Sequence, residues 1–376
     1  MRSLIPLLLL AACGASNGSD ASAQPASSGT RPFAVRPIAT FDEPWAMAFL
    51  PGPGPRALIT EMKGKLKLLW SDSGRVGDVA GAPKVDHGGQ GGFGDVVLHP
   101  RFAQNRLVYL SWVEAGSGGN RGAVVGRARF LENGGRPRLE GLRVIWRQTP
   151  KLSGRGHYGH RIAFGPDGKL YVSNGDRQEF TPAQDMSGTL GKIVRLNDDG
   201  TVPADNPFAK RGGVTAQIWS LGHRNPLGIA FDGSGRLWDI EMGPKGGDEL
   251  NLVQRGRNYG YPIVSDGDHY DGRDIPDHRT RPEFEAPKVV WTPVISPGNM
   301  IFYSGNAFSG WRGDILVAGL SSKALIRVDV NGNTAREAER WDMGQRIREV
   351  EQGPDGSVYL LEDGKGGRLL RLTPAR

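Results

Sequence analysis

The apolar residues of this chain recur in short alternating segments separated by turns rich in Pro, Asp and Gly. In the clearest copy, residues 162–164 lead through Pro166-Asp167-Gly168 to a second apolar segment at residues 170–172. Pro presets φ at the first corner of such a turn and Gly accepts a positive φ, so the sequence predicts a tight β-hairpin. The same unit occurs in six copies, which begin near residues 48, 97, 163, 230, 301 and 351.

The copies are spaced roughly 45 to 70 residues apart, which is what a blade of four strands requires. We therefore predict an all-β protein, a six-bladed β-propeller of four-stranded antiparallel blades, over residues 33–376. A pair of β-sandwiches is the alternative, but recurrence along the whole sequence disfavours it. No segment indicates a strong helix. The longest insertion, near residues 255–295, is expected to form a loop on one face of the propeller, where functional loops gather.

The composition supports this architecture and does not indicate binding to nucleic acids. The chain has 376 residues, of which 56 are Gly and 26 are Pro, as expected for many short strands joined by tight turns. The net charge is +7, but the basic residues are dispersed. This distribution is compatible with an anionic ligand or surface, and we expect no nucleic-acid partner.

The N-terminal residues indicate export. Arg2 precedes an apolar segment at residues 4–10 that is too short to span a bilayer, and Leu10-Ala11-Ala12-Cys13 is similar to a bacterial lipobox. We predict a signal peptide with lipobox over residues 1–12 and a flexible tether over 13–32. The mature protein would be periplasmic and bound to a bacterial membrane only through lipid on Cys13, the one cysteine of the chain. An ordinary signal peptide with an incidental Cys13 is the alternative.

A candidate general base lies at one end of the central hairpin. His157 precedes the first strand and Asp176 follows the second, so the hairpin should bring both to the same rim. A carboxylate beside a histidine can orient and tune the imidazole as a base. The alternative is a solvated loop histidine beside a common Asn-Gly-Asp turn.

Further polar groups precede the repeat strand in other copies. Gln90 lies in a Gly-rich loop before the second copy, Arg224 and Asn225 precede the fourth, and Arg346 and Arg348 precede the sixth. Arginine suits a carboxylate or a developing oxyanion. Equivalent positions of successive blades face one end of a propeller, so these groups predict a central pocket. Residues 241–249 contain bends that expose carbonyls suited to Ca²⁺, although no dedicated calcium-loop spacing is present.

These motifs resemble those of the soluble-type sugar dehydrogenases that depend on pyrroloquinoline quinone (PQQ). This is the glucose/sorbosone dehydrogenase family, and the likeness is greatest to its bacterial aldose sugar dehydrogenases. The resemblance covers roughly residues 36–374, and its motifs include Gly89-Gln90-Gly91-Gly92, His157 with Arg161, Gly175-Asp176, Arg224-Asn225-Pro226, Gly246-Gly247-Asp248-Glu249 and Arg346-Ile347-Arg348.

The resemblance implies a role for each candidate residue. His157 would take the proton of the anomeric hydroxyl while the C1 hydride passes to PQQ, giving the lactone, and Asp176 would hold its tautomer. The PQQ contacts implied are Gln90, His157, Arg224, Asn225, Arg346 and Arg348, with Arg224 also counted as catalytic. Carbonyls of Gly243 and Pro244 would hold Ca²⁺.

The sequence departs from the family pattern at two positions. Ser321 stands where the family often has a PQQ-binding lysine, and Lys323, two residues on, is the candidate replacement. His160 occupies a position that is often small in the family and is expected near the pocket mouth.

The leading hypothesis is a PQQ- and Ca²⁺-dependent dehydrogenase that oxidises aldose sugars and passes electrons to an external acceptor. Two alternatives remain: a propeller that binds sugars or proteins without turnover, and a Ca²⁺-dependent hydrolase of the lactonase type. The hydrolase would need side-chain carboxylates and Asn around a central metal, which the motifs do not indicate.

Overall fold

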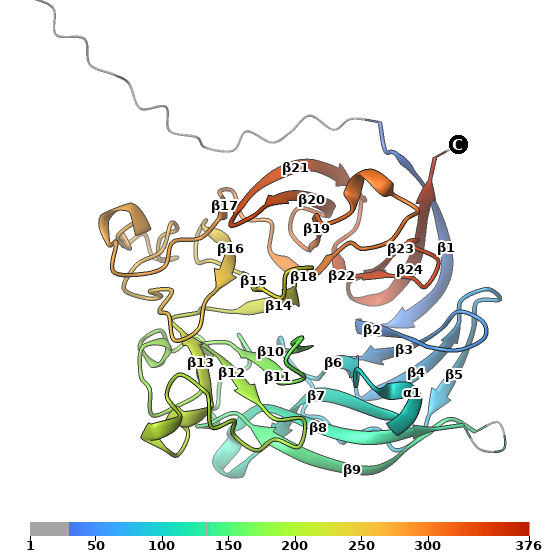
Figure 1. Ribbon diagram of the computed structural model, residues 1–376, viewed down its shortest axis with the longest axis horizontal. Helices are drawn as coiled ribbons and strands as arrows, with labels where there is room; N and C mark the ends of the chain where they lie inside the picture. The colour runs from blue at the N-terminus through green and yellow to red at the C-terminus, as the bar shows by residue number, and fades with distance from the viewer. Residues whose placement is uncertain (1–29, 133, 135, 376) are drawn as a thin grey trace, which may run out of the picture.

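The structure is a computed structural model that describes residues 30–132, 134 and 136–375. Its strands form six separate four-stranded antiparallel sheets arranged around a central axis (Figure 1). The predicted fold class is therefore confirmed. The predicted signal peptide, Cys13 and most of the predicted tether lie outside the described residues. Within the described part of the chain, no helix has the length and apolar character needed to cross a membrane.

Each sheet begins with an innermost strand that contains the start of one sequence copy. The first three sheets are β2 (Pro44–Leu50), β3 (Arg56–Glu61), β4 (Lys65–Trp70), β5 (Arg75–Val79); β6 (Phe93–Leu98), β7 (Leu107–Ala115), β8 (Arg121–Leu131), β9 (Arg138–Arg147); and β10 (Gly159–Phe164), β11 (Leu170–Asn174), β12 (Lys192–Leu196), β13 (Ile218–Leu221). The next two are β14 (Pro226–Phe231), β15 (Leu237–Glu241), β16 (Asp248–Val253), β17 (Val289–Trp291); and β18 (Pro297–Phe302), β19 (Ile315–Gly319), β20 (Ala324–Asn331), β21 (Thr334–Asp342).

The sixth sheet joins the two ends of the propeller. It contains β22 (Ile347–Gln352), β23 (Val358–Glu362) and β24 (Lys365–Pro374), and its outermost strand is β1 (Phe33–Asp42) from the start of the domain. Phe33 pairs with Pro374 and Asp42 with Lys365 (Figure 1). This pairing hydrogen-bonds the first strand to the last and closes the ring.

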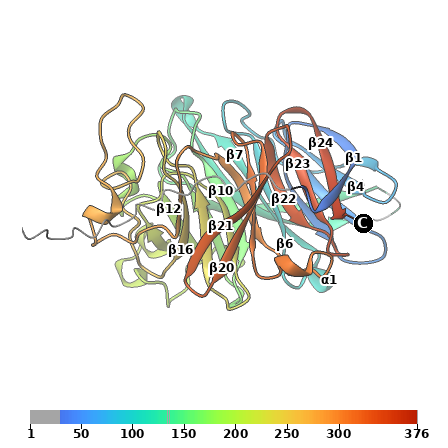
Figure 2. The same cartoon turned by 90° about the horizontal axis from the view of Figure 1, so that it is seen from above.

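Within the described residues, helical structure is confined to connections. The helices are α1 (Phe102–Asn105) and the 3₁₀ turns η1 (Ser117–Gly119), η3 (Thr181–Ala183), η4 (Ala209–Arg211), η5 (Thr215–Gln217), η6 (His278–Thr280) and η7 (Ser309–Trp311). The long insertion predicted near residues 255–295 is the connection between β16 and β17, which contains only η6. In the side view, this loop extends away from the sheets (Figure 2).

The apolar core lies between neighbouring sheets. One buried cluster joins the first two sheets, with Leu58 and Leu68 from one and Val108 and Leu110 from the other. Burying each such side chain contributes about 1.5–3 kcal/mol. The innermost strands contact one another in the closed cycle β2, β6, β10, β14, β18, β22 and back to β2. The loops that precede these strands are therefore held on a rigid ring.

Candidate active site

A cavity of about 420 Å³ lies where the innermost strands begin. Its lining includes Gln90, Asn225, Arg346 and Arg348, which come from three different blades. These four residues converge on one cavity, as their common place before the repeat strands predicted, whereas His157 and Arg224 are not among the residues that line it.

His157 and Asp176 meet at the rim of the predicted hairpin. β10 and β11 pair antiparallel, with Ile162 opposite Val172 and a register shift between Ile162 and Gly159. His157 Nδ1 lies 2.7 Å from Asp176 Oδ1, and Asp176 is fully buried. Because the carboxylate can only accept, Nδ1 carries the hydrogen and Nε2 is left with its lone pair. Burial lowers the pKa of His157 below its ordinary value, although Asp176 acts in the opposite direction. The imidazole is therefore a neutral proton acceptor.

His157 is tied to the cavity through its backbone. Its N–H donates to Gln90 Oε1 at 2.7 Å, and Gln90 lines the cavity. The residue has a left-handed φ of 46°. Such a conformation costs roughly 1–3 kcal/mol for a residue with a side chain and persists where surrounding contacts impose it, often at functional sites.

Arg224 and Asn225 are positioned by hydrogen bonds to the hairpin at residues 159–176 and to Met242. The Arg224 carbonyl accepts the Asp176 N–H at 2.8 Å, which joins this loop to the His157–Asp176 pair. Arg224 Nη1 donates to the Met242 carbonyl at 2.9 Å, while its buried Nε has no partner among the described residues. Asn225 Oδ1 accepts the Gly159 N–H at 3.2 Å. A buried donor without a partner is costly, and it suits an anionic ligand at this position.

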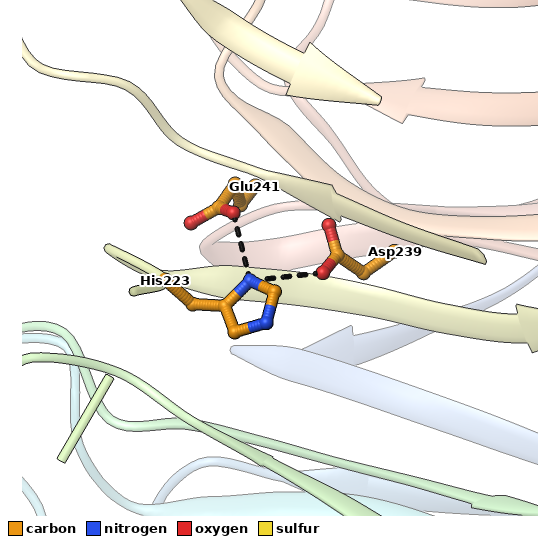
Figure 3. Close-up of side chains that lie close together, drawn as sticks. All are labelled: His223, Asp239 and Glu241. Atoms are coloured by element: carbon orange, nitrogen blue, oxygen red, sulfur yellow. Dashed lines mark hydrogen bonds and ion pairs between the residues drawn. The ribbon is translucent and has the colours of Figure 1, made fainter. Parts of the chain in front are cut away.

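A buried charged cluster supports the Arg224–Asn225 loop. Glu241 Oε2 accepts the backbone N–H groups of Arg224 and Asn225 at 2.5 and 3.2 Å. Its Oε1 lies 3.1 Å from His223 Nδ1, which is also 3.1 Å from Asp239 Oδ2 (Figure 3). Burial alone would lower the pKa of His223, but the two carboxylates raise it to about 10. His223 is therefore an imidazolium that neutralises part of the negative charge beneath the loop.

Arg346 and Arg348 form the predicted pair of guanidinium groups. Both donate to one carboxylate, Asp363, through Nε at 2.8 and 2.9 Å. Burial alone would raise the pKa of Asp363, but the arginines bring it below its ordinary value. Asp363 also lines the cavity. It was not predicted, because it follows the strand after the two arginines and no spacing rule connects it to them.

Comparison with known proteins identifies the family. A family model described as Glucose / Sorbosone dehydrogenase matches residues 41–371. The chain belongs to this family. It is 40% identical over 338 residues to Aldose sugar dehydrogenase YliI of Escherichia coli (strain K12), which covers 89% of this chain and 90% of the relative.

Solved structures with a similar fold carry related descriptions. The soluble aldose sugar dehydrogenase of Escherichia coli in the apo-form has a TM-score of 0.85 and 39% identity, covering 91% of this chain and 100% of the other. The PQQ-bound form of an aldose sugar dehydrogenase from Streptomyces coelicolor has a TM-score of 0.75 and 28% identity, covering 91% and 98%. The predicted membership in the glucose/sorbosone dehydrogenase family is confirmed.

The candidate metal ligands of this family member follow the cavity residue Met242. Gly243 donates its N–H to Asp248 Oδ1 at 2.8 Å, which fixes the bend. No hydrogen bond reaches the carbonyl oxygens of Gly243 or Pro244 from the described residues. Free carbonyls are suitable ligands for a hard cation, but neither residue is among those that line the cavity.

Lys323 is a predicted cofactor ligand that the structure does not bring to the cavity. It is exposed, has a left-handed φ of 52°, and does not line the cavity, whereas Leu320 of the same connection does. Ser321 Oγ donates to the Val294 carbonyl at 3.2 Å. The structure gives no support for Lys323 as a replacement cofactor ligand.

The sequence indicated Arg161 only as part of the His157 motif and did not predict that it contacts several blades near the axis. Its guanidinium lies 2.8 Å from Glu349 Oε2 and 3.5 Å from Asp95 Oδ1, and it donates to the Leu227 carbonyl at 2.7 Å. These partners come from three different innermost strands, β22, β6 and β14, and Arg161 itself lies on β10. Arg161 therefore pairs with two buried carboxylates that come from different blades.

Proposed function

We propose that this protein is a PQQ- and Ca²⁺-dependent dehydrogenase that oxidises aldose sugars at C1 to the lactone and passes electrons to an external acceptor. This proposal is carried by His157, a neutral, carboxylate-oriented base whose backbone N–H is hydrogen-bonded to Gln90 in the cavity wall. The same wall contains guanidinium and amide donors. The membership of the chain in the glucose/sorbosone dehydrogenase family supports the same reaction.

The donor set fits PQQ, a planar acid with several carboxylates. Arg346 and Arg348 present two guanidinium groups beside Asp363, and Arg224 contributes a buried Nε that no described residue contacts by a hydrogen bond. Gln90 and Asn225 add amide groups that donate and accept. When bound, PQQ supplies an electrophilic quinone carbon that accepts the hydride. The free carbonyls of Gly243 and Pro244 would hold the Ca²⁺ that polarises the quinone.

The chain's own residues would handle the proton. His157 Nε2, with its lone pair directed away from Asp176, would accept the proton of the anomeric hydroxyl as the C1 hydride leaves. Asp176 would hold the imidazole in that tautomer and stabilise the imidazolium that forms. Arg224 would stabilise negative charge that develops on oxygen at the reacting centre.

Reconstitution of purified protein tests the proposal. Apo-protein with stoichiometric PQQ and Ca²⁺ should reduce an artificial acceptor dye when glucose or another aldose is added, and PQQ or Ca²⁺ alone should give little activity. Chelation of Ca²⁺ before PQQ is added should prevent activation. Saturable sugar binding without a bound-PQQ spectrum or dye reduction would instead support the non-catalytic propeller, and lactone hydrolysis would support the hydrolase.

The two arginines should contribute unequally to cofactor binding. The Arg348 side chain is 13% exposed and that of Arg346 is 48% exposed. Arg348→Ala should weaken PQQ binding by about 1.5–3 kcal/mol, as expected for a buried charged hydrogen bond. Arg346→Ala should cost less than about 1 kcal/mol because solvent screens it. Titration of apo-protein with PQQ measures both, and equal losses would contradict the assignment.

A further inference from the structure

His160 lies in the wall of the cavity, at a position shaped to admit its ring. The residue is 2% exposed, and its imidazole stacks on Trp45 with ring centroids 5.0 Å apart and planes 10° apart. A β-carbon added to Gly94 would lie 1.9 Å from His160 Cε1, so the absence of a side chain at Gly94 makes room for the imidazole. His160 also has a left-handed φ of 55°. Several features of the surrounding chain therefore fix this ring beside the cavity.

Hydrogen bonds determine which ring nitrogen of His160 carries the hydrogen. Ser111 is fully buried, and its Oγ accepts the Asp95 N–H at 2.8 Å. The same Oγ lies 2.8 Å from His160 Nδ1. Among the described residues, Nδ1 is the only acceptor that the Ser111 hydroxyl has. Because a buried hydroxyl hydrogen needs an acceptor, Ser111 donates to Nδ1 and the ring hydrogen is on Nε2.

His160 is neutral in this environment. Burial, reinforced by the positive charges of Arg161, Arg177 and Arg348, lowers the pKa of His160 to about 3. No hydrogen bond reaches Nε2 from the part of the chain that the structure describes. The ring therefore offers the cavity a single uncharged N–H donor, near cationic groups that attract an anionic oxygen.

The two histidines at residues 157 and 160 have opposite tautomers. His157 gives its Nδ1–H to Asp176 and keeps a lone pair on Nε2. His160 receives a hydrogen bond at Nδ1 and keeps its hydrogen on Nε2. The first ring is suited to accept a proton, and the second is suited only to donate a hydrogen bond. The two tautomers differ because Nδ1 of His157 faces a carboxylate, which accepts a hydrogen bond, whereas Nδ1 of His160 faces a hydroxyl, which donates one.

We propose that His160 is a cofactor-binding residue that donates its Nε2–H to a carbonyl or carboxylate oxygen of the quinone cofactor. The proposal rests on the proposed function, in which this cavity binds PQQ. Ser111 acts through His160 as a positioning residue, because its hydroxyl holds the donating tautomer. Gly94 leaves the space in which the ring lies.

PQQ titration of apo-protein variants tests this contact without measuring turnover. His160→Phe keeps an aromatic ring beside Trp45 and removes the donor, so the dissociation constant for PQQ should rise roughly ten- to hundred-fold. The absorption spectrum of bound PQQ should also change. His160→Gln has a side-chain amide donor and should recover most of the affinity. His99→Gln changes a buried histidine outside the cavity lining and should bind PQQ as the wild type does.

NMR of protein labelled with ¹⁵N-histidine tests the tautomer directly. His160 should show an Nε2–H signal that is lost in His160→Gln and moves when PQQ is added, and Ser111→Ala should shift it toward a mixture of tautomers. The proposal is overturned if His160 carries its hydrogen on Nδ1, or if Nε2–H does not respond to PQQ. It is also overturned if folded His160→Phe binds PQQ with wild-type affinity and spectrum. If the wild type binds no PQQ, the proposed function itself fails.

Discussion

Replacement of His157 by Ala should reduce sugar-dependent dye reduction by about 10²- to 10⁴-fold in protein loaded with PQQ and Ca²⁺, as expected for loss of a general base. Asp176→Asn should have an effect in the same direction. An amide at this position can donate to Nδ1, which would place the imidazole hydrogen on Nε2 and remove the lone pair that accepts the proton. Steady-state kinetics with a saturating aldose measures both losses.

The pH profile separates a general base from a residue that only supports the loop. The reaction needs neutral His157, so kcat/KM should fall as the pH decreases through the pKa of His157. Burial places that pKa below the ordinary value of 6.5, so the acid limb should lie below pH 6.5. PQQ titration of each variant is the control, because His157 was also predicted to contact the cofactor. Full activity of His157→Ala would refute the mechanism.

Local sequence signals were sufficient for the hairpin that carries these two residues. Pro166-Asp167-Gly168 specifies a turn, and alternating residues on both sides specify strands whose ends must meet. That short segment predicts that His157 and Asp176 lie at the same rim, and hydrogen bonds to Gln90 and to the Arg224 carbonyl complete their placement. Recurrence of the same pattern gave the six blades, because each copy repeats the same local physical requirement.

The closure of the ring could not be predicted in the same way. The strand that starts at Phe33 alternates apolar and polar residues as many other strands do. Its sequence does not indicate that its partner begins at Lys365. The pairing joins the first strand of the propeller to its last, which are far apart in the sequence. Prediction from single-sequence patterns does not include such long-range pairing.

Position relative to the repeat strand also limited which site residues could be predicted. Gln90, Asn225, Arg346 and Arg348 were found because they share one place relative to the repeat strand. Asp363 lies outside that shared place, just after the neighbouring strand β23, and contacts Arg346 and Arg348 of the same blade. For Lys323, strand alternation suggested the same side as Ser321, but β19 ends at Gly319 and the Lys323 side chain is exposed.

The charged cluster beneath Arg224 gives the largest expected effect on stability. His223→Gln would leave Asp239 and Glu241 buried without their imidazolium (Figure 3). Breaking a buried ion pair by removal of one partner typically costs about 3–5 kcal/mol. Urea unfolding of apo-protein at pH 7 should show a loss of this size. Asp239→Asn combined with His223→Gln should recover part of it, because only one carboxylate then remains buried.

The change of the free energy of unfolding with pH tests whether the charge of His223 is responsible for this stabilisation. The pKa of His223 is about 10 in the folded protein, above its ordinary value of 6.5, so the folded state binds this proton more tightly. The stabilisation is complete below about pH 6.5 and decreases as the pH rises toward 10. His223→Gln should lack this part of the slope, and the gap between variant and wild type should narrow as the pH rises. A gap that stays constant from pH 6 to pH 10 would show that the imidazole is held by packing on Tyr259 and by Ser220, rather than by charge.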